Sequence, residues 1–203
     1  FNTMNPEYIS ELFKSKAGSN EIAGMVTLRE VVRFCREHKP SSVLELGGGI
    51  GTISYAVLSN CDATIDIYEH NDFCNAALNE NLKDYKGRFV VIPDYLSLPP
   101  RREYDLIIID GGKGKHALDG GFPRGVNAYI HSLDSLATIF IEGERKSQRF
   151  WVTQALRTRF VYTPHKYYDL ANKKKGMLRL DCKPSSNEII RLVNHWYWRK
   201  KIY

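Results

Sequence analysis

One short stretch constrains this chain more than any other, because an apolar run breaks into glycines and then resumes as apolar sequence. Residues 43–46 (Val-Leu-Glu-Leu) are typical of a short buried parallel strand, and residues 53–58 (Ile-Ser-Tyr-Ala-Val-Leu) predict a helix. Between them, four of the five residues at 47–51 are glycine. Glycine lets a ligand come close to the backbone, and the start of a helix presents unpaired N–H groups. The sequence therefore predicts a ligand-binding turn at the end of this strand.

The spacing of these glycines narrows the choice of ligand. The dinucleotide fingerprint G-x-G-x-x-G would need glycine at 47, 49 and 52, and position 52 is threonine. The chain instead has an acidic residue two places before a G-x-G-x-G turn: Glu45, Gly47, Gly49 and Gly51. This pattern resembles the first motif of the class I S-adenosylmethionine (SAM) methyltransferases, and the resemblance implies that these four residues bind the cofactor SAM. A glycine-rich turn without a ligand is the structural alternative.

A second acidic residue follows the next predicted strand. Residues 63–68 predict this strand, and Glu69 comes directly after it, roughly 20 residues past Gly49. A carboxylate has two acceptor oxygens, which suit the two hydroxyl groups of a ribose. In the methyltransferases that the chain resembles, the acid at this strand end has that role. Capping of the next helix is the alternative, although Asn71 or Asp72 can serve for that.

The third predicted strand, residues 88–92, is followed by Asp94 and Tyr95. The resemblance implies that Asp94 accepts a hydrogen bond from the adenine amino group, and that Tyr95 or Leu96 packs against the ring. An aspartate after a proline is also an ordinary choice for a turn.

The fourth predicted strand, residues 104–110, is the clearest in the chain because four large apolar residues in a row suit a central strand covered on both faces. It ends at Asp110, and ligands of open α/β sheets bind outside such strand ends. The glycine-rich residues 111–127 after it predict an acceptor-side loop. We therefore expect Asp110 to line the cofactor pocket and to act in catalysis with Lys113 or His116.

The spacing of Asp110 and Lys113 resembles the D-x-x-K segment of the catechol and caffeoyl-CoA type O-methyltransferases. There the aspartate binds a divalent metal and the lysine assists deprotonation. The chain departs from that family, since Glu142-Gly143 replaces Asp-Asn after the fifth strand and Gly111-Gly112 replaces the usual Ala-Asp. We predict no metal site; Asp110 and Glu142 would be the ligands if one existed, with Mg²⁺ or Ca²⁺ favoured by oxygen donors. In the metal-free alternative, His116 is the base, because imidazole titrates near neutral pH.

The remaining patterns complete an α/β architecture. We predict a Rossmann-like, doubly wound, seven-stranded and mostly parallel sheet with an antiparallel terminal hairpin, preceded by N-terminal helices. The resemblance covers roughly residues 20–183. The expected helices are residues 6–16, 19 or 20 to 38, 72–85, 128–135 and 147–157, and the later strands are 137–141, 160–168 and 177–182. The expected organisation is helices at 1–40 that pack on the core, a SAM-binding core at 41–183, and a basic and aromatic C-terminal helix or tail at 184–203.

That tail differs from the rest of the chain. Residues 187–193 can form a helix, and residues 195–201 (His-Trp-Tyr-Trp-Arg-Lys-Lys) are aromatic and then basic. Aromatic residues beside cations suit a membrane interface or stacked nucleic acid. We favour a helix docked on its own domain through its Trp residues, and peripheral membrane contact through the tail stays open.

Composition describes a globular chain of 203 residues, of which 43% are hydrophobic and 26% charged. No apolar run is long enough to span a membrane. The four cysteines lack C-x-x-C spacing, which favours free thiols in a reducing compartment, and we expect a cytoplasmic protein. The chain starts at Phe1 with no signal-peptide pattern, consistent with trimming at its N-terminus.

Together these patterns predict a SAM-dependent methyltransferase that transfers a methyl group to a small-molecule or glycan-type acceptor, at oxygen. The net charge of +6 suits an anionic acceptor, nucleic acid or an acidic membrane, or merely reflects a solvated surface. A nucleic-acid methyltransferase is the first alternative, but the sequence has no N/D-P-P-Y/F segment after the fourth strand and no Pro-Cys. A Rossmann-like domain with a non-catalytic interaction role is the second. The oligomeric state and the acceptor's identity stay open.

Overall fold

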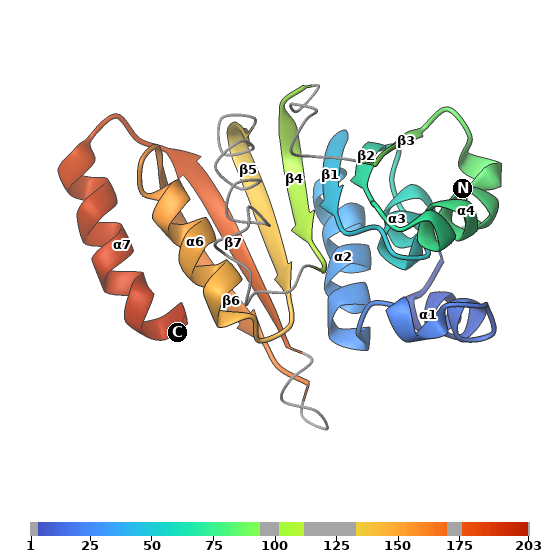
Figure 1. The fold of residues 1–203 in the computed structure, drawn as a ribbon. Coiled ribbons are helices and arrows are strands. Elements are labelled where there is room, and N and C mark those ends of the chain that lie inside the picture. The colour runs from blue at the N-terminus through green and yellow to red at the C-terminus, as the bar shows by residue number, and fades with distance from the viewer. Residues whose placement is uncertain (1–3, 94–101, 112–132, 170–175, 203) are drawn as a thin grey trace.

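A seven-stranded sheet runs through the centre of the molecule in the order β3-β2-β1-β4-β5-β7-β6 (Figure 1). Strands β1 to β5 are parallel, and β7 runs antiparallel to both of its neighbours, β5 and β6. The computed structural model describes residues 4–93, 102–111, 133–169 and 176–202. The strands are β1 (Ser42–Leu46), β2 (Thr64–Tyr68), β3 (Phe89–Ile92), β4 (Tyr104–Ile109), β5 (Leu133–Glu142), β6 (Phe160–Tyr167) and β7 (Met177–Pro184). The predicted α/β fold class, with its antiparallel terminal hairpin, is confirmed.

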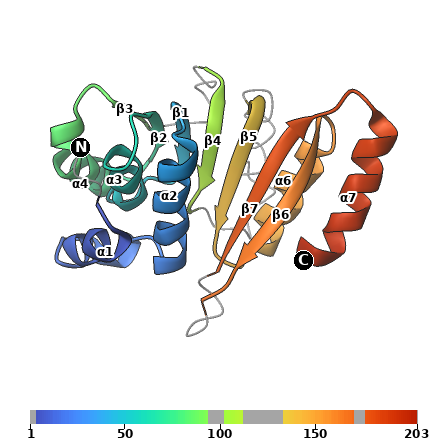
Figure 2. The same cartoon turned by 180° about the vertical axis from the view of Figure 1, so that it is seen from behind.

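Helices cover both faces of this sheet. The N-terminal half of the chain supplies the helices of one face, and the last two helices lie on the other (Figures 1 and 2). The helices are α1 (Pro6–Lys14), η1 (Ser19–Glu21), α2 (Met25–His38), α3 (Thr52–Leu58), α4 (Asp72–Asn81), η2 (Lys83–Tyr85), α6 (Lys146–Leu156) and α7 (Glu188–Ile202).

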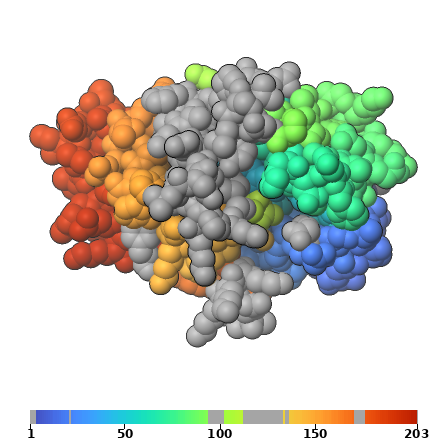
Figure 3. All heavy atoms as spheres, viewed as in Figure 1, coloured from blue at the N-terminus to red at the C-terminus, as the bar shows by residue number. Residues whose placement is uncertain are grey.

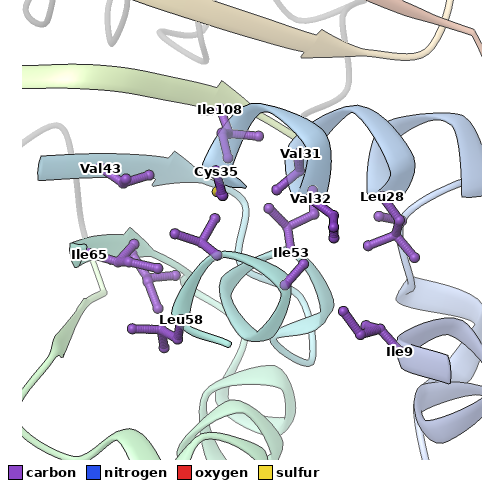
Figure 4. Packing of buried hydrophobic residues seen from close by; sticks show 14 of the residues in the cluster. Ile9, Leu28, Val31, Val32, Cys35, Val43, Ile53, Leu58, Ile65 and Ile108 are labelled. Carbon is purple, nitrogen blue, oxygen red and sulfur yellow. The ribbon is translucent and has the colours of Figure 1, made fainter. Parts of the chain in front are cut away.

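The apolar runs of the central strands are explained by this two-sided cover. Val43 packs with α2 and α3 on one face, whereas Leu44 and Leu46 belong to the core on the other. Figure 4 shows Val43, Ile65 and Ile108 pointing into the first core, toward the side chains of α2 and α3. Each of these strands alternates between two buried environments, which explains why their sequences are mostly apolar; Glu45 of β1 and Asp66 of β2 are buried acids that interrupt the pattern.

Side-chain caps fix where two of the helices begin, as the sequence predicted. The Asn5 side chain accepts the Tyr8 N–H at 2.7 Å, and Pro6 occupies the first position of α1. The Asn71 side chain accepts the Cys74 N–H at 3.0 Å and starts α4.

The predicted continuous helix from residue 19 or 20 to residue 38 is wrong. The structure divides it into η1 and α2, with Gly24 in an extended conformation between them (φ −66°, ψ 151°). The Gly24 N–H donates a hydrogen bond to Glu142 at 2.8 Å, a contact 118 residues along the chain. Gly24 is thus the N-cap of α2, a position that glycine can occupy, and a tertiary hydrogen bond holds its backbone there.

The predicted helix at 128–135 is wrong over the residues that the structure describes. β5 begins at Leu133, which pairs with Tyr104 of β4 across a register shift between Tyr104 and Leu106. Pairing with the central strand overrides the local preference.

The predicted C-terminal helix is present as α7. It docks through His195 and Ile202, which are buried, and Trp198 packs partly against the same core. Trp196 is 58% exposed, so docking through both Trp residues is only partly correct.

Candidate active site

The glycine turn lies where β1, β2 and β4 end. Gly47 has a φ of +93°, and a β-carbon on it would lie 1.7 Å from the carbonyl oxygen of Asp110. A β-carbon on Gly48 would lie 2.5 Å from Cγ2 of Ile67. The N–H groups of Gly47 and Gly48 both donate to the Tyr68 carbonyl, at 2.9 and 3.2 Å. The turn therefore packs directly against the ends of three strands, and a side chain at Gly47 or Gly48 would clash with them.

The turn leads directly into α3. Gly51, with a φ of +92°, precedes Thr52, the first residue of that helix. The Thr52 side chain is almost fully buried, and its hydroxyl has no hydrogen-bond partner among the residues that the structure describes.

Glu69 holds this turn from the end of β2. One of its carboxylate oxygens accepts the Gly49 N–H at 2.8 Å, and the other accepts the Asn71 N–H at 2.9 Å. The side-chain cap of α4 comes from Asn71, so Glu69 does not serve as that cap, which was the alternative role. Each carboxylate oxygen has two acceptor positions, so Glu69 can still accept hydrogen bonds from a ligand.

Glu45 lies beneath the turn and not on its surface. Its side chain is fully buried and accepts a hydrogen bond from the Ser54 hydroxyl in the first turn of α3. Burial raises the pKa of Glu45 from 4.5 to about 8, against the opposing effect of that hydrogen bond. In this structure Glu45 supports the turn from below; direct contact with a cofactor stays a prediction.

A second acidic pair lies at the ends of β4 and β5. Asp110 and Glu142 follow or end neighbouring strands that pair in register up to Ile109 and Ile141. The Arg145 guanidinium lies near both, 3.8 Å from an Asp110 oxygen and 3.7 Å from a Glu142 oxygen. Burial, and then the neighbouring Glu142 carboxyl, raises the pKa of Asp110 well above its ordinary value, and Arg145 opposes this only in part. Asp110 is therefore a stronger base than an ordinary aspartate.

The carbonyl of Gly111 is held by two further donors. Arg145 and Gln148 each donate to it at 2.6 Å. Both come from α6 or the residue just before it, so the helix after β5 fixes the backbone at Gly111, the last described residue before the segment predicted to be the acceptor-side loop.

Four acids, Glu45, Glu69, Asp110 and Glu142, lie at the same edge of the sheet. The raised pKa values of Glu45 and Asp110 favour their neutral forms. Negative charge at the described strand ends therefore rests mainly on Glu69 and Glu142, and Arg145 balances part of it.

A metal site of three or more His, Cys, Asp or Glu ligands is not found within the described ranges. Asp110 and Glu142, the two ligands weighed from the sequence, both lie within ion-pair distance of Arg145. The absence of a metal site stays a prediction.

The other predicted site residues fall outside the part of the chain that the structure describes. These are Asp94 and Tyr95 after β3, and Lys113 and His116 after β4. Of the residues described, the sequence analysis missed Arg145, Gln148 and Thr52, whereas Glu142 was a candidate at a strand end, both for the acceptor's proton and as a metal ligand. For Arg145 the available signal was its place three residues after an acid at a strand end.

Solved methyltransferases share this fold. Methyltransferase PaMTH1 of Podospora anserina, solved with S-adenosylhomocysteine (SAH), is 17% identical, with a TM-score of 0.63 over 88% of this chain and 87% of that one. The O-methyltransferase TomG of Streptomyces achromogenes, involved in tomaymycin synthesis and solved with SAM, is 11% identical, with a TM-score of 0.68 over 90% and 92%. The N-methyltransferase NodS of Bradyrhizobium japonicum, solved with SAH, is 10% identical, with a TM-score of 0.60 over 90% and 100%.

These similarities establish the fold, that of the class I SAM-dependent methyltransferases. No protein-family model matches the sequence, and neither does a curated protein. Since the structures that share the fold include both O- and N-methyltransferases, the fold does not decide the acceptor.

Proposed function

We propose that this chain is a SAM-dependent methyltransferase that acts at an oxygen of a small-molecule or glycan-type acceptor. The observation that carries the proposal is the turn at Gly47, which excludes side chains and lies beside the Glu69 carboxylate at the ends of β1 and β2. The solved structures with the same fold that contain SAM or SAH support the choice of cofactor.

The residues at the strand ends fit the parts of SAM. Glu69 would accept the ribose hydroxyls with the acceptor positions that its two backbone hydrogen bonds leave open. Gly47, Gly49 and Gly51 would let the cofactor reach the backbone, with Glu45 supporting them. Asp94 and Tyr95 are proposed for the adenine ring.

The charge of the site also fits. SAM carries a sulfonium and an ammonium group, and the carboxylates of Glu69 and Glu142, only partly balanced by Arg145, complement these cations.

Bound SAM would supply an electrophilic methyl group, and the protein would then have to position the acceptor and take up its proton. Asp110 is suited to accept that proton, because burial and Glu142 raise its pKa. Lys113 is proposed to stabilise the developing negative charge on the acceptor oxygen, and His116 is the other candidate base.

The proposal is tested by calorimetry with SAM and SAH. We expect both to bind, and Glu69→Ala to weaken binding by about 1–3 kcal/mol, as for a hydrogen-bonded group that loses its partner. Glu80→Ala is the matched control, since Glu80 is an exposed acid paired with Lys83. Thermal unfolding of both variants separates a lost contact from a loosened turn. Absence of binding by either ligand at millimolar concentration would overturn the cofactor assignment.

The acceptor side is tested by turnover, after a screen of phenols, sugars and anionic metabolites. We expect Lys113→Ala and His116→Ala to leave SAM affinity nearly unchanged, while one of them lowers turnover by about 10²–10⁴-fold. Two variants with the turnover of the parent protein would show that this loop does not handle the proton.

A further inference from the structure

The C-terminal helix α7 is held to the domain by one face. The residues at positions 191, 195, 198 and 202 form that inner stripe, in which His195 and Ile202 are buried. The His195 ring lies 2.7 Å from the Tyr162 hydroxyl. The Asn194 side chain accepts the Tyr162 N–H at 3.0 Å and donates to its carbonyl at 3.1 Å, so it pairs with edge strand β6 as a neighbouring strand would. This face is therefore fixed by polar contacts as well as by burial.

The opposite face of α7 is apolar and exposed. Of the 13 large hydrophobic side chains exposed among the described residues, 6 lie on this 15-residue helix. Their exposed fractions are Ile189 73%, Ile190 54%, Leu192 45%, Val193 59%, Trp196 58% and Tyr197 52%. The spacing of three and four residues places them on one face, which lies at one end of the molecule (red in Figure 3). An exposed apolar face of this kind marks a site of interaction.

Cations border this face at its C-terminal end. Arg199, Lys200 and Lys201 close the helix, and Glu188 is its one acidic residue. The Lys200 ammonium lies 5.5 Å from the centre of the Trp196 ring, and that of Lys201 lies 4.4 Å from the centre of the Tyr197 ring. Cationic and aromatic side chains next to an apolar stripe are the composition of helices that lie in a membrane interface.

We propose that the outer face of α7 docks on a lipid surface that carries anionic headgroups. The apolar side chains would enter the boundary between headgroups and acyl chains, while the three terminal cations contact the headgroups. The helix would lie on the membrane, because no helix of the described residues is long and apolar enough to cross one.

The same observations disfavour two other occupants. In a self-paired dimer, each helix would bring three cations (Arg199, Lys200 and Lys201) against a single acid of its partner. Single-stranded nucleic acid binds by stacking of bases on aromatic rings, and four of the six exposed apolar residues are aliphatic.

Co-sedimentation of the full chain with vesicles tests the proposal. We expect binding to vesicles of phosphatidylcholine with phosphatidylserine, and much weaker binding to phosphatidylcholine alone. Val193→Ser with Trp196→Ser should abolish binding to both. Lys200→Gln with Lys201→Gln should weaken binding to the anionic vesicles by about 10- to 30-fold, because each cation near the surface contributes about 1 kcal/mol to binding.

Matched controls carry the same chemical changes at the other end of the sheet. Lys83→Gln with Lys86→Gln removes two exposed cations, and Val90→Ser removes an exposed apolar side chain; both should bind like the parent protein. An equal loss of vesicle binding in the control variants would overturn the proposal, and so would a parent protein that does not bind anionic vesicles. So would sedimentation velocity that shows a dimer lost on Trp196→Ser, since the outer face would then be a subunit interface.

Discussion

At the scale of single residues, Glu45 is a carboxyl group buried where a negative charge is costly. Its pKa of about 8 in the folded protein lies above its ordinary value of 4.5, so the folded state binds this proton more tightly than the unfolded state does. The stability that Glu45 contributes is therefore complete below pH 4.5 and is lost as the pH rises through 8. Asp110 has a raised pKa as well, and its contribution changes in the same direction.

We expect Glu45→Gln to flatten this pH dependence. The free energy of unfolding in urea should fall more steeply in the parent protein than in the variant between about pH 5 and pH 8, by up to about 1.4 kcal/mol per pH unit. Asp110 is common to both proteins, so the difference between the two curves reports Glu45 alone. Parallel curves would show that Glu45 is not perturbed by burial.

Residue spacing predicted part of the site and could not predict the rest. The sequence between Gly47 and Glu69 is long enough for one turn, one helix (α3) and one strand (β2). The structure brings the glycine turn and Glu69 together at the strand ends. Arg145 meets Asp110 only because β4 and β5 are neighbours in the sheet. No local pattern carries that information.

At the scale of elements, the strands were predicted well because they are buried on both faces. The run at 106–109 needs no tertiary information to be identified as central. Both errors fall where the backbone contacts a residue far away in the sequence. Gly24, the N-cap of α2, donates a hydrogen bond to Glu142, and Leu133 pairs with Tyr104 of β4.

The docking of α7 should depend on pH through His195. Burial, and then Arg157 and Arg199, lowers the pKa of His195 below 6.5, so the folded state binds its proton less tightly than the unfolded state does. The stability that this residue contributes is present above pH 6.5 and is lost as the pH falls. We therefore expect amide protection of α7 to decrease between about pH 7.5 and pH 5, with the amides of α3 unaffected.

His195→Gln is the variant that isolates this effect. It should weaken the contact with Tyr162 at every pH, because glutamine lacks the two ring nitrogens, but α7 should then lose its dependence on pH. Protection of α7 that still falls with acid in this variant would assign the effect to another group.

At the scale of the whole molecule, charge is divided between two regions. The strand ends carry the carboxylates of the candidate active site, whereas the cations of α7 lie on the outer helix beyond β6. The net charge of +6 therefore does not describe the strand ends, where the carboxylates of Glu69 and Glu142 outnumber Arg145 among the described residues and disfavour a polyanion.

This division leads to an expectation about the acceptor. Transfer of a methyl group to a phenol or sugar acceptor should change by less than about twofold between 50 and 200 mM salt, because few phosphate contacts are involved. A polynucleotide held by six or more cations would lose about 10³-fold in affinity over the same range. The measurement is the rate of transfer from labelled SAM at both salt concentrations, with RNA and DNA assayed beside the small acceptors. Methylation of RNA or DNA that disappears at the higher salt concentration would reverse the assignment, since the basic surface would then hold the substrate and the strand ends only the cofactor.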